Sequence, residues 1–274
     1  MPSSSKSKNE LFKTIPLIIS LTGLIGQASA TLVAYYNMEQ GSSPLIDQVG
    51  GEIASAVDSG HQYGAAGPAG FGNAVGLNAN GGWQLSVADS AALNLANNFT
   101  VAGWINIDSA IVKSQPAADN HRILGDDSAW DGDGWAFGVT GGVMRFTRNG
   151  IVDADDPSGT AVPTDSWVHI AATPTSTGIN FYLNGVLTGT NGNGADNNTG
   201  LGNNGLEDPY GVGRAYGNAK DQYFPGLLDE VRVYDSVLTQ PEIAALMTAV
   251  PEPSTGLLIG LAGLAVGLRR RRSC

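Results

Sequence analysis

Short stretches in which apolar residues occupy every second position recur through the middle of the chain, and this alternation constrains the fold more than any other feature. Residues 32–38, 99–107 and 179–183 show it most clearly, and residues 135–139, 143–147 and 167–173 are further strand candidates. A period of two places the apolar side chains on one face of a β-strand. The sequence therefore predicts a largely β protein.

Clusters of glycine, asparagine and aspartate separate these stretches. The 38 glycines are about twice the usual share of about 7%, which favours tight turns between short strands. One segment predicts a helix, because Thr239 and Glu242 have the spacing of a capping box, Pro241 lies in the first turn and Ile243 begins an apolar face. This all-β pattern with one terminal helix indicates an antiparallel two-sheet sandwich of the jelly-roll kind.

The first thirty residues have the pattern of a secretory signal peptide. Three lysines precede an apolar run from Ile15 to Ile25, and Ala28 and Ala30 provide a small-residue cleavage site. We expect residues 1–30 to be a signal helix that is removed on export. Residues 31–249 are then expected to form a single folded domain.

The charge of that domain limits its partners. Residues 31–249 carry 7 basic and 23 acidic side chains, a net charge of −16. Nucleic acid is excluded as a partner, because phosphate binding needs clustered lysine and arginine. The acidic surface suits divalent cations or solubility. The single cysteine, Cys274, lies outside the domain, so the domain has no disulfide, thiol nucleophile or cysteine-based metal site.

The last 25 residues combine three features, which are Pro251, Glu252 and Pro253, an apolar stretch from Gly256 to Leu268, and the cluster Arg269, Arg270, Arg271 and Arg272. Thirteen helical residues span about 20 Å, less than the roughly 30 Å of a bilayer's hydrocarbon core. The segment therefore predicts a short hydrophobic helix that anchors weakly. The arginines would stay cytoplasmic and place the preceding domain outside. An ordinary short C-terminal anchor is the alternative.

This arrangement resembles the PEP-CTERM sorting signal of bacteria that make extracellular polysaccharide. The resemblance implies that an exosortase recognises Pro251, Glu252 and Pro253 and removes the hydrophobic tail, which until then anchors the protein in the membrane. The expected location is the cell envelope, the cell surface or the extracellular matrix. Release and covalent attachment both remain open.

The order of several segments within residues 31–249 carries a second resemblance. They are the opening segment 32–41, then 99–105, 167–173 and 181–185, and the closing segment Gly226–Tyr234. Together they resemble the laminin G-like, concanavalin A-like jelly roll of many bacterial surface proteins. The resemblance implies a sandwich of about a dozen strands in which the N- and C-terminal strands are adjacent.

Asp229 is the most informative carboxylate, because it shares strand parity with Leu227 and Val231. A buried carboxylate is costly unless it is paired, hydrogen-bonded or bound to a metal. Related sandwiches commonly hold a structural calcium ion where the first and last strands meet. The resemblance places Asp229 in that role, with Glu39 and Asp47 as further ligands. Alternatively, Asp229 accepts backbone hydrogen bonds at a strand end while Glu39 and Asp47 are solvated turn residues.

No arrangement in the sequence indicates catalysis. The paired carboxylates that glycosidases use on one strand are absent. His61, His121 and His169 lack zinc spacing, and His169 is best interpreted as a packed histidine. A second acidic cluster, formed by Asp126, Asp127, Asp131 and Asp133, is best interpreted as a solvated loop. We expect a protein that is not an enzyme.

The sequence therefore predicts an exported, non-enzymatic surface or biofilm-matrix protein whose sandwich binds extracellular polysaccharide, surface glycan or another surface partner. Exposed aromatic residues on loops would bind sugars, and the candidates are Trp83, Trp130, Tyr210, Tyr216 and Tyr223. Most of these are expected to be packing residues, so the sequence assigns no ligand-binding residue. The alternatives are a purely structural matrix component and a degenerate polysaccharide hydrolase.

Overall fold

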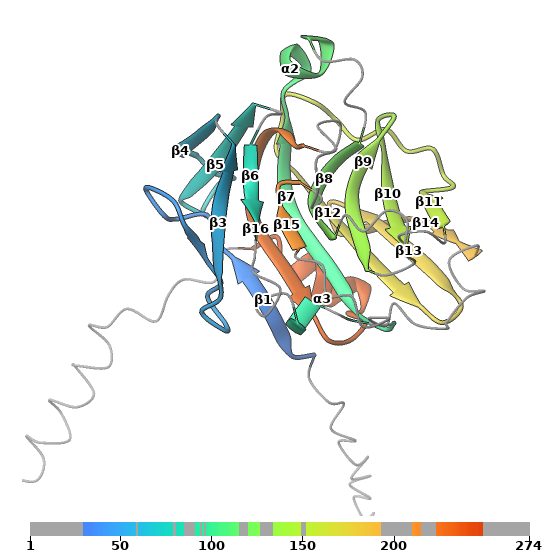
Figure 1. Ribbon diagram of the computed structural model, residues 1–274. Helices are drawn as coiled ribbons and strands as arrows, with labels where there is room; N and C mark the ends of the chain where they lie inside the picture. The colour runs from blue at the N-terminus through green and yellow to red at the C-terminus, as the bar shows by residue number, and fades with distance from the viewer. Residues whose placement is uncertain are drawn as a thin grey trace, which may run out of the picture.

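The computed structural model describes residues 30–58, 60–78, 81–84, 91–93, 95, 97–114, 120–126, 134–148, 152–192, 210–214 and 223–248. These residues form two antiparallel sheets that face each other (Figure 1). The fold is the predicted antiparallel two-sheet jelly-roll sandwich. Both termini and the sorting motif lie outside the described residues.

One sheet, here called the β16 sheet, has the strand order β14-β13-β12-β7-β16-β5-β4, and β1 also pairs with β16. Its strands are β14 (Val186–Asn191), β13 (Gly178–Leu183), β12 (Val168–Thr175), β7 (Thr100–Ile107), β16 (Pro225–Tyr234), β5 (Asn73–Asn78), β4 (His61–Ala66) and β1 (Leu32–Tyr36). β16 pairs with β7 along one side, and with β5 and then β1 along the other. The first and last strands are therefore neighbours, as predicted.

The other sheet, here called the β9 sheet, has the strand order β11-β10-β9-β8-β15-β6-β3-β2. Its strands are β11 (Val152–Asp155), β10 (Val143–Arg148), β9 (Trp135–Thr140), β8 (Asn120–Asp126), β15 (Tyr210–Val212), β6 (Gly81–Gln84), β3 (Ile53–Asp58) and β2 (Leu45–Ile46). The described residues thus form more strands, and shorter ones, than the dozen expected. Short strands such as β2 and β15 show too little alternation to be recognised in the sequence.

The apolar faces of the two sheets enclose one core. Large aromatic side chains from both sheets are buried in it, among them Trp83, Trp135 and Phe181. The ring of Trp135 packs against Phe99 with a centroid distance of 4.9 Å, and its Nε1 donates a hydrogen bond to the carbonyl oxygen of Leu93 at 2.9 Å. Burial of aromatic surface of this kind is the main source of stability in such a sandwich.

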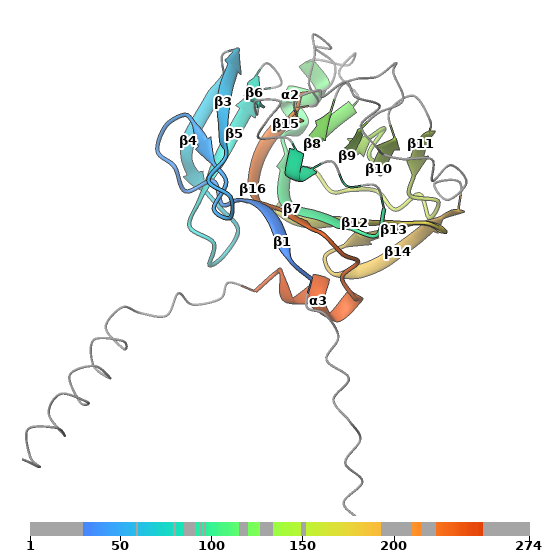
Figure 2. The same ribbon diagram turned by 60° about the horizontal axis from the view of Figure 1, so that its bottom comes forward.

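The predicted terminal helix is confirmed as α3 (Gln240–Ala245). Thr239 is its N-cap, and a carboxylate oxygen of Glu242 accepts the Thr239 backbone N–H at 2.7 Å. Ile243 is buried in a small second cluster with Ala102 and Ala171. Figure 2 shows α3 on the side of the β16 sheet that faces away from the β9 sheet. Part of this outer face is therefore covered.

The helix α2 (Ser109–Ser114), which follows β7, was not predicted from the sequence. Asp108 precedes it, and its Oδ1 accepts the backbone N–H groups of Ala110 and Ile111 at 2.8 and 3.2 Å. The 3-10 helix η1 (Ala91–Leu93) was also not predicted. Both elements are too short to show a helical period in the sequence.

Candidate functional site

A β-bulge in β16 decides which way its carboxylates point. The register with β7 shifts between Asp229 and Arg232, and Glu230 has a φ of 54°. Asp229 pairs with Trp104 on the outer face of the β16 sheet, whereas Val231 belongs to the core between the sheets. The predicted shared parity of Asp229 and Val231 is therefore wrong, because the bulge adds one residue between them. The shared parity of Asp229 with Leu227 holds.

The carboxylate of Asp229 is fully buried. Its Oδ1 accepts the backbone N–H of Glu230 at 2.8 Å, and its Oδ2 has no hydrogen-bond partner among the described residues. Burial, together with the nearby charges of Glu230 and Glu39, raises the pKa of Asp229 to about 8. Without an added positive charge, the protonated form of this carboxyl therefore prevails at neutral pH.

Glu39 follows β1 and lies against the turn between β4 and β5. Its two carboxylate oxygens accept the backbone N–H and the side-chain amide of Asn73, each at 3.0 Å. The positive φ of Gly72, 82°, favours glycine there. A Cβ on Gly72 would lie 2.2 Å from Glu39 Oε1, and one on Gly67 would lie 2.8 Å from Asp229 Oδ2. The turn is therefore in close contact with both acidic residues.

The carbonyl oxygen of Gly72 belongs to the same arrangement. This oxygen accepts the backbone N–H of Gly67 at 2.9 Å. A Cβ added to Gly67 would lie 2.9 Å from the same oxygen and 2.8 Å from Asp229 Oδ2, so both oxygens lie beside Gly67. The structure thus brings Asp229, Glu39 and a backbone carbonyl to one turn. Among the described residues, however, no group of three or more histidine, cysteine, aspartate or glutamate side chains could hold a metal ion.

Asp47 has a different environment. It is buried, its Oδ1 accepts the backbone N–H groups of Tyr35 and Val49 at 2.6 and 3.1 Å, and its Oδ2 accepts that of Gly50 at 2.9 Å. Asp47 therefore holds the turn after β2 and ties that turn to β1. It is not a solvated turn residue, and both of its oxygens are already engaged.

A largely buried ion pair, which was not predicted from the sequence, lies next to Asp229. Arg232 bonds to Glu230, and the Tyr35 hydroxyl donates to Glu230 Oε1 at 2.6 Å. The guanidinium carbon of Arg232 lies 4.6 Å from the centroid of the Tyr35 ring. The spacing of Glu230 and Arg232 along a strand could have indicated a pair, but the bulge that makes them meet has no clear sequence signal.

The histidines show no arrangement for catalysis in the described residues. His169 is buried, as interpreted from the sequence, and burial and the charge of Arg232 lower its pKa to about 3. Its ring lies edge-on to Trp104. His61 Nε2 lies 2.8 Å from the carbonyl oxygen of Gly82, and His121 is also buried.

The aromatic candidates for sugar binding mostly pack within the protein. Trp83, Tyr210 and Tyr223 are buried, so they do not form an exposed stacking platform. Trp130 and Tyr216 lie outside the described residues, as do Asp127, Asp131 and Asp133 of the second acidic cluster. The side chain of Asp126 is likewise outside the description.

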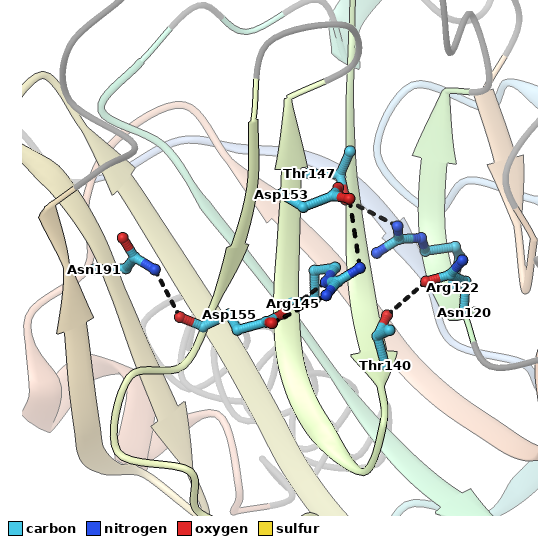
Figure 3. Close-up of polar contacts among 8 residues, drawn as sticks. All are labelled: Asn120, Arg122, Thr140, Arg145, Thr147, Asp153, Asp155 and Asn191. Atoms are coloured by element: carbon cyan, nitrogen blue, oxygen red, sulfur yellow. Dashed lines mark hydrogen bonds and ion pairs between the residues drawn. The ribbon is translucent and has the colours of Figure 1, made fainter.

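The outer face of the β9 sheet carries a polar ladder in which two aspartates and a threonine hydroxyl bond to arginines on nearby strands. Arg145 on β10 pairs with Asp155 and Asp153 on β11, with the shortest contact 2.6 Å. The Thr147 hydroxyl donates to Asp153 at 2.7 Å and accepts from Arg122 Nη2 at 2.8 Å. Figure 3 shows these side chains converging across neighbouring strands.

Comparisons with known proteins agree with this architecture. The family model of the concanavalin A-like lectin/glucanases superfamily, Laminin_G_3, matches residues 78–244, more than half of the chain. The chain belongs to the Laminin_G_3 family. The PEP-CTERM protein-sorting motif matches residues 249–272, so this laminin G-like chain carries a bacterial sorting signal. No curated protein sequence matches it significantly.

Solved structures of other proteins share this laminin G-like fold. Domain 4 of AbnA, a GH43 extracellular arabinanase from Geobacillus stearothermophilus solved with arabinotriose, matches with a TM-score of 0.57 and 20% identity over 80% of this chain and 99% of that domain. The binding domain of Paraclostridial Mosquitocidal Protein 1 matches with a TM-score of 0.56, 18% identity and 79% of this chain. Trypanosoma rangeli sialidase with sialic acid has a TM-score of 0.54, 16% identity and the same coverage.

The chain spans 51% of the mosquitocidal binding domain and 32% of the sialidase. At these identities the likeness concerns the fold alone. Among the described residues, no helix is long and apolar enough to cross a membrane. The predicted signal helix, the hydrophobic C-terminal helix and the sorting residues 251–253 and 269–272 lie outside that part of the chain.

Proposed function

We propose that this chain is an exported, non-enzymatic surface or matrix protein whose sandwich binds extracellular glycan or another surface partner. The observation that carries the proposal is the combination, on one chain, of a concanavalin A-like sandwich and a PEP-CTERM sorting motif. The arabinanase domain with its bound arabinotriose is an example of this fold in contact with a glycan.

Binding of the purified protein to an array of bacterial and plant polysaccharides tests this proposal. We expect selective, saturable binding to a small set of glycans. A uniform absence of signal would favour a purely structural matrix component. Release of reducing sugar that one carboxylate substitution abolishes would instead indicate a degenerate hydrolase.

The C-terminal segment is proposed to direct processing. An exosortase would recognise Pro251, Glu252 and Pro253 and remove the apolar tail, so that the membrane holds the protein only before cleavage. Mass spectrometry of the protein recovered from its host should find a C-terminus close to this motif. Glu252→Ala should retain the full tail, whereas Ser254→Ala, just outside the motif, should be processed normally. Equal processing of both variants would contradict this role.

A structural calcium ion at the β4–β5 turn is a second part of the proposal. The unpartnered Oδ2 of Asp229, the carboxylate of Glu39 and the carbonyl oxygen of Gly72 are the proposed protein ligands. Calcium takes six to eight oxygen ligands at about 2.3–2.6 Å, so further carbonyls and water must complete the set. A bound cation would also stabilise the charged form of Asp229. Asp47 is the weakest of the three predicted ligands, because its oxygens accept three backbone N–H groups at the turn after β2, whereas Glu39 lies against the β4–β5 turn.

A further inference from the structure

A hollow of about 330 Å³ lies on the outer face of the β16 sheet, next to α2. Its floor is a row of directly paired residues on four neighbouring strands, which are Gln62, Gly76, Leu227 and Asn106 on β4, β5, β16 and β7. Directly paired residues point to the same side of a sheet. We propose that this hollow binds the neutral end, or a short neutral segment, of a polysaccharide. This inference rests on the glycan-binding function proposed above.

Gly76 creates the space in the floor. A Cβ at this position would lie 3.2 Å from Gln62 Cβ and 3.2 Å from Leu227 Cδ2, so any side chain would crowd both neighbours and fill the gap between them. A glycine in the interior of a strand weakens the strand, and it often marks a site where a ligand approaches the backbone closely.

The wall next to α2 is held in place by two acidic residues. Asp108 Oδ1 accepts two backbone N–H groups of α2, and Asp165 Oδ1 accepts the backbone N–H of Ser109 at 3.0 Å. The backbone N–H of Asp165 in turn donates to the carbonyl oxygen of Ile107 at 2.8 Å. Ile111 of α2 adds an apolar surface to this wall. A wall fixed in this way loses little conformational entropy when a ligand binds.

The lining determines the chemical class of the ligand. Side-chain amides such as those of Gln62 and Asn106 both donate and accept hydrogen bonds, and carboxylates accept them. This combination matches the hydroxyl groups of a sugar, while Leu227 and Ile111 offer contact to its C–H groups. Among the described residues, the lining contains Asp108 and Asp165 but no lysine, arginine or histidine, which disfavours uronates, sialic acids and sulfated sugars.

The volume also limits the ligand. Pockets for small molecules measure about 300–1,000 Å³, and this hollow lies at the lower end of that range. A chain end or a few sugar units therefore fits better than a long stretch of polymer.

The hollow lies away from the end of the sandwich where the described chain begins and ends. Leu227 is near the start of β16, whereas Tyr234 at its far end pairs with Leu32 of β1. The backbone N–H of Thr31 also bonds to Asp235. Figure 1 shows α2 and the start of β1 at opposite ends of the molecule. A protein held near its C-terminus would thus present the hollow outward.

Calorimetric titration of the purified protein with arabinotriose, cellotriose, mannotriose and trigalacturonate tests this inference. At least one neutral trisaccharide should bind, and trigalacturonate should bind more weakly. Asn106→Ala and Gln62→Ala should each weaken that binding by about tenfold, as expected for the loss of a hydrogen bond to the ligand. Gln240→Ala is the matched control, because Gln240 is exposed on α3 and should leave the affinity unchanged.

The outcomes separate the two proposals. If a neutral sugar binds equally well to the wild type, Asn106→Ala and Gln62→Ala, the hollow is not the binding site, although the protein still binds glycan. A preference for trigalacturonate would also overturn the stated ligand class. An absence of binding to these probes and to the polysaccharide array would overturn both. Thermal unfolding of each variant shows whether it is folded, and Gln62 is exposed, so its truncation leaves the core intact.

Discussion

The outer faces of the two sheets differ in how their carboxylates are satisfied. On the β9 sheet, Arg145 bonds to two aspartates and the Thr147 hydroxyl links the ladder to Arg122. On the β16 sheet, Asp229 Oδ2 is buried and has no partner among the described residues. Buried polar groups in folded proteins are normally paired. The carboxylates of the first face therefore have partners on that face, whereas the unpartnered oxygen of Asp229 makes the second face the place to expect an additional ligand.

The largest expected difference is between the two arginine networks, because the ion pair of Arg232 is more buried than that of Arg145. Arg232→Ala would leave the buried carboxylate of Glu230 without its cation, and removal of one partner of a buried pair typically costs about 3–5 kcal/mol. We expect a loss of at least about 3 kcal/mol in the free energy of unfolding, measured by urea denaturation. A loss below about 1 kcal/mol would mean that this pair behaves like a surface pair.

Asp47, whose oxygens both accept hydrogen bonds, can be compared with Asp229, which has one oxygen without a partner among the described residues. Asp47→Ala removes the acceptor of three backbone N–H groups, so we expect a loss of about 1–3 kcal/mol in unfolding free energy. Because the Asp47 carboxylate bonds to backbone N–H groups and not to the proposed ion, calcium should raise the melting temperature of this variant as much as that of the wild type. A calcium effect that disappears in this variant would make Asp47 a ligand after all.

The raised pKa of Asp229 predicts that, in the presence of chelator, the free energy of unfolding depends on pH. The pKa rises from 3.8 to about 8 because of burial first and then the charges of Glu230 and Glu39. Between these values the folded protein binds more protons than the unfolded chain at this group. The contribution of Asp229 to stability is therefore present below about pH 4 and is lost as the pH rises towards 8, by up to about 1.4 kcal/mol per pH unit.

Asp229→Asn is the control for that pH dependence, because the amide cannot titrate. The difference in unfolding free energy between wild type and variant, measured by urea denaturation in chelator at several values from pH 5 to 8, should change with pH in the predicted direction. A constant difference would show that the Asp229 carboxyl keeps an ordinary pKa in the folded protein.

The smallest effect is expected on the β9 sheet. Arg145 and Asp155 are partly exposed, with 21% and 44% of their side-chain surface accessible. Exposed ion pairs contribute about 0.2–1 kcal/mol. Arg145→Ala should therefore lower the free energy of unfolding by less than about 1 kcal/mol, and added salt should reduce the difference further. A loss comparable to that of Arg232→Ala would remove the contrast between the two faces.

The sequence predicted those parts of the molecule that rest on local patterns. Alternation predicted β7, β9, β10, β12 and β13, and the capping box of Thr239 and Glu242 predicted α3. The order of the segments indicated the jelly-roll sandwich.

Features that depend on distant residues were not predictable. Glu230 adopts a positive φ although it is not glycine, so the bulge that reverses the parity of β16 left no sequence signal. The hollow combines Gln62, Gly76, Asn106 and Leu227, which only the pairing of four strands brings together. The family resemblance gave Asp47 as a metal ligand, and the sequence could not show that its oxygens accept three backbone N–H groups.

Thermal unfolding of wild type and Asp229→Asn, each with calcium and with chelator, tests most directly whether the unsatisfied face holds an ion. Calcium at a hundred times its dissociation constant stabilises a folded protein by about 2.7 kcal/mol. For a domain of this size, this corresponds to a rise of about 5–10 °C in the melting temperature. We expect this rise for the wild type and none for Asp229→Asn. Equal melting temperatures of the wild type in calcium and in chelator would contradict it.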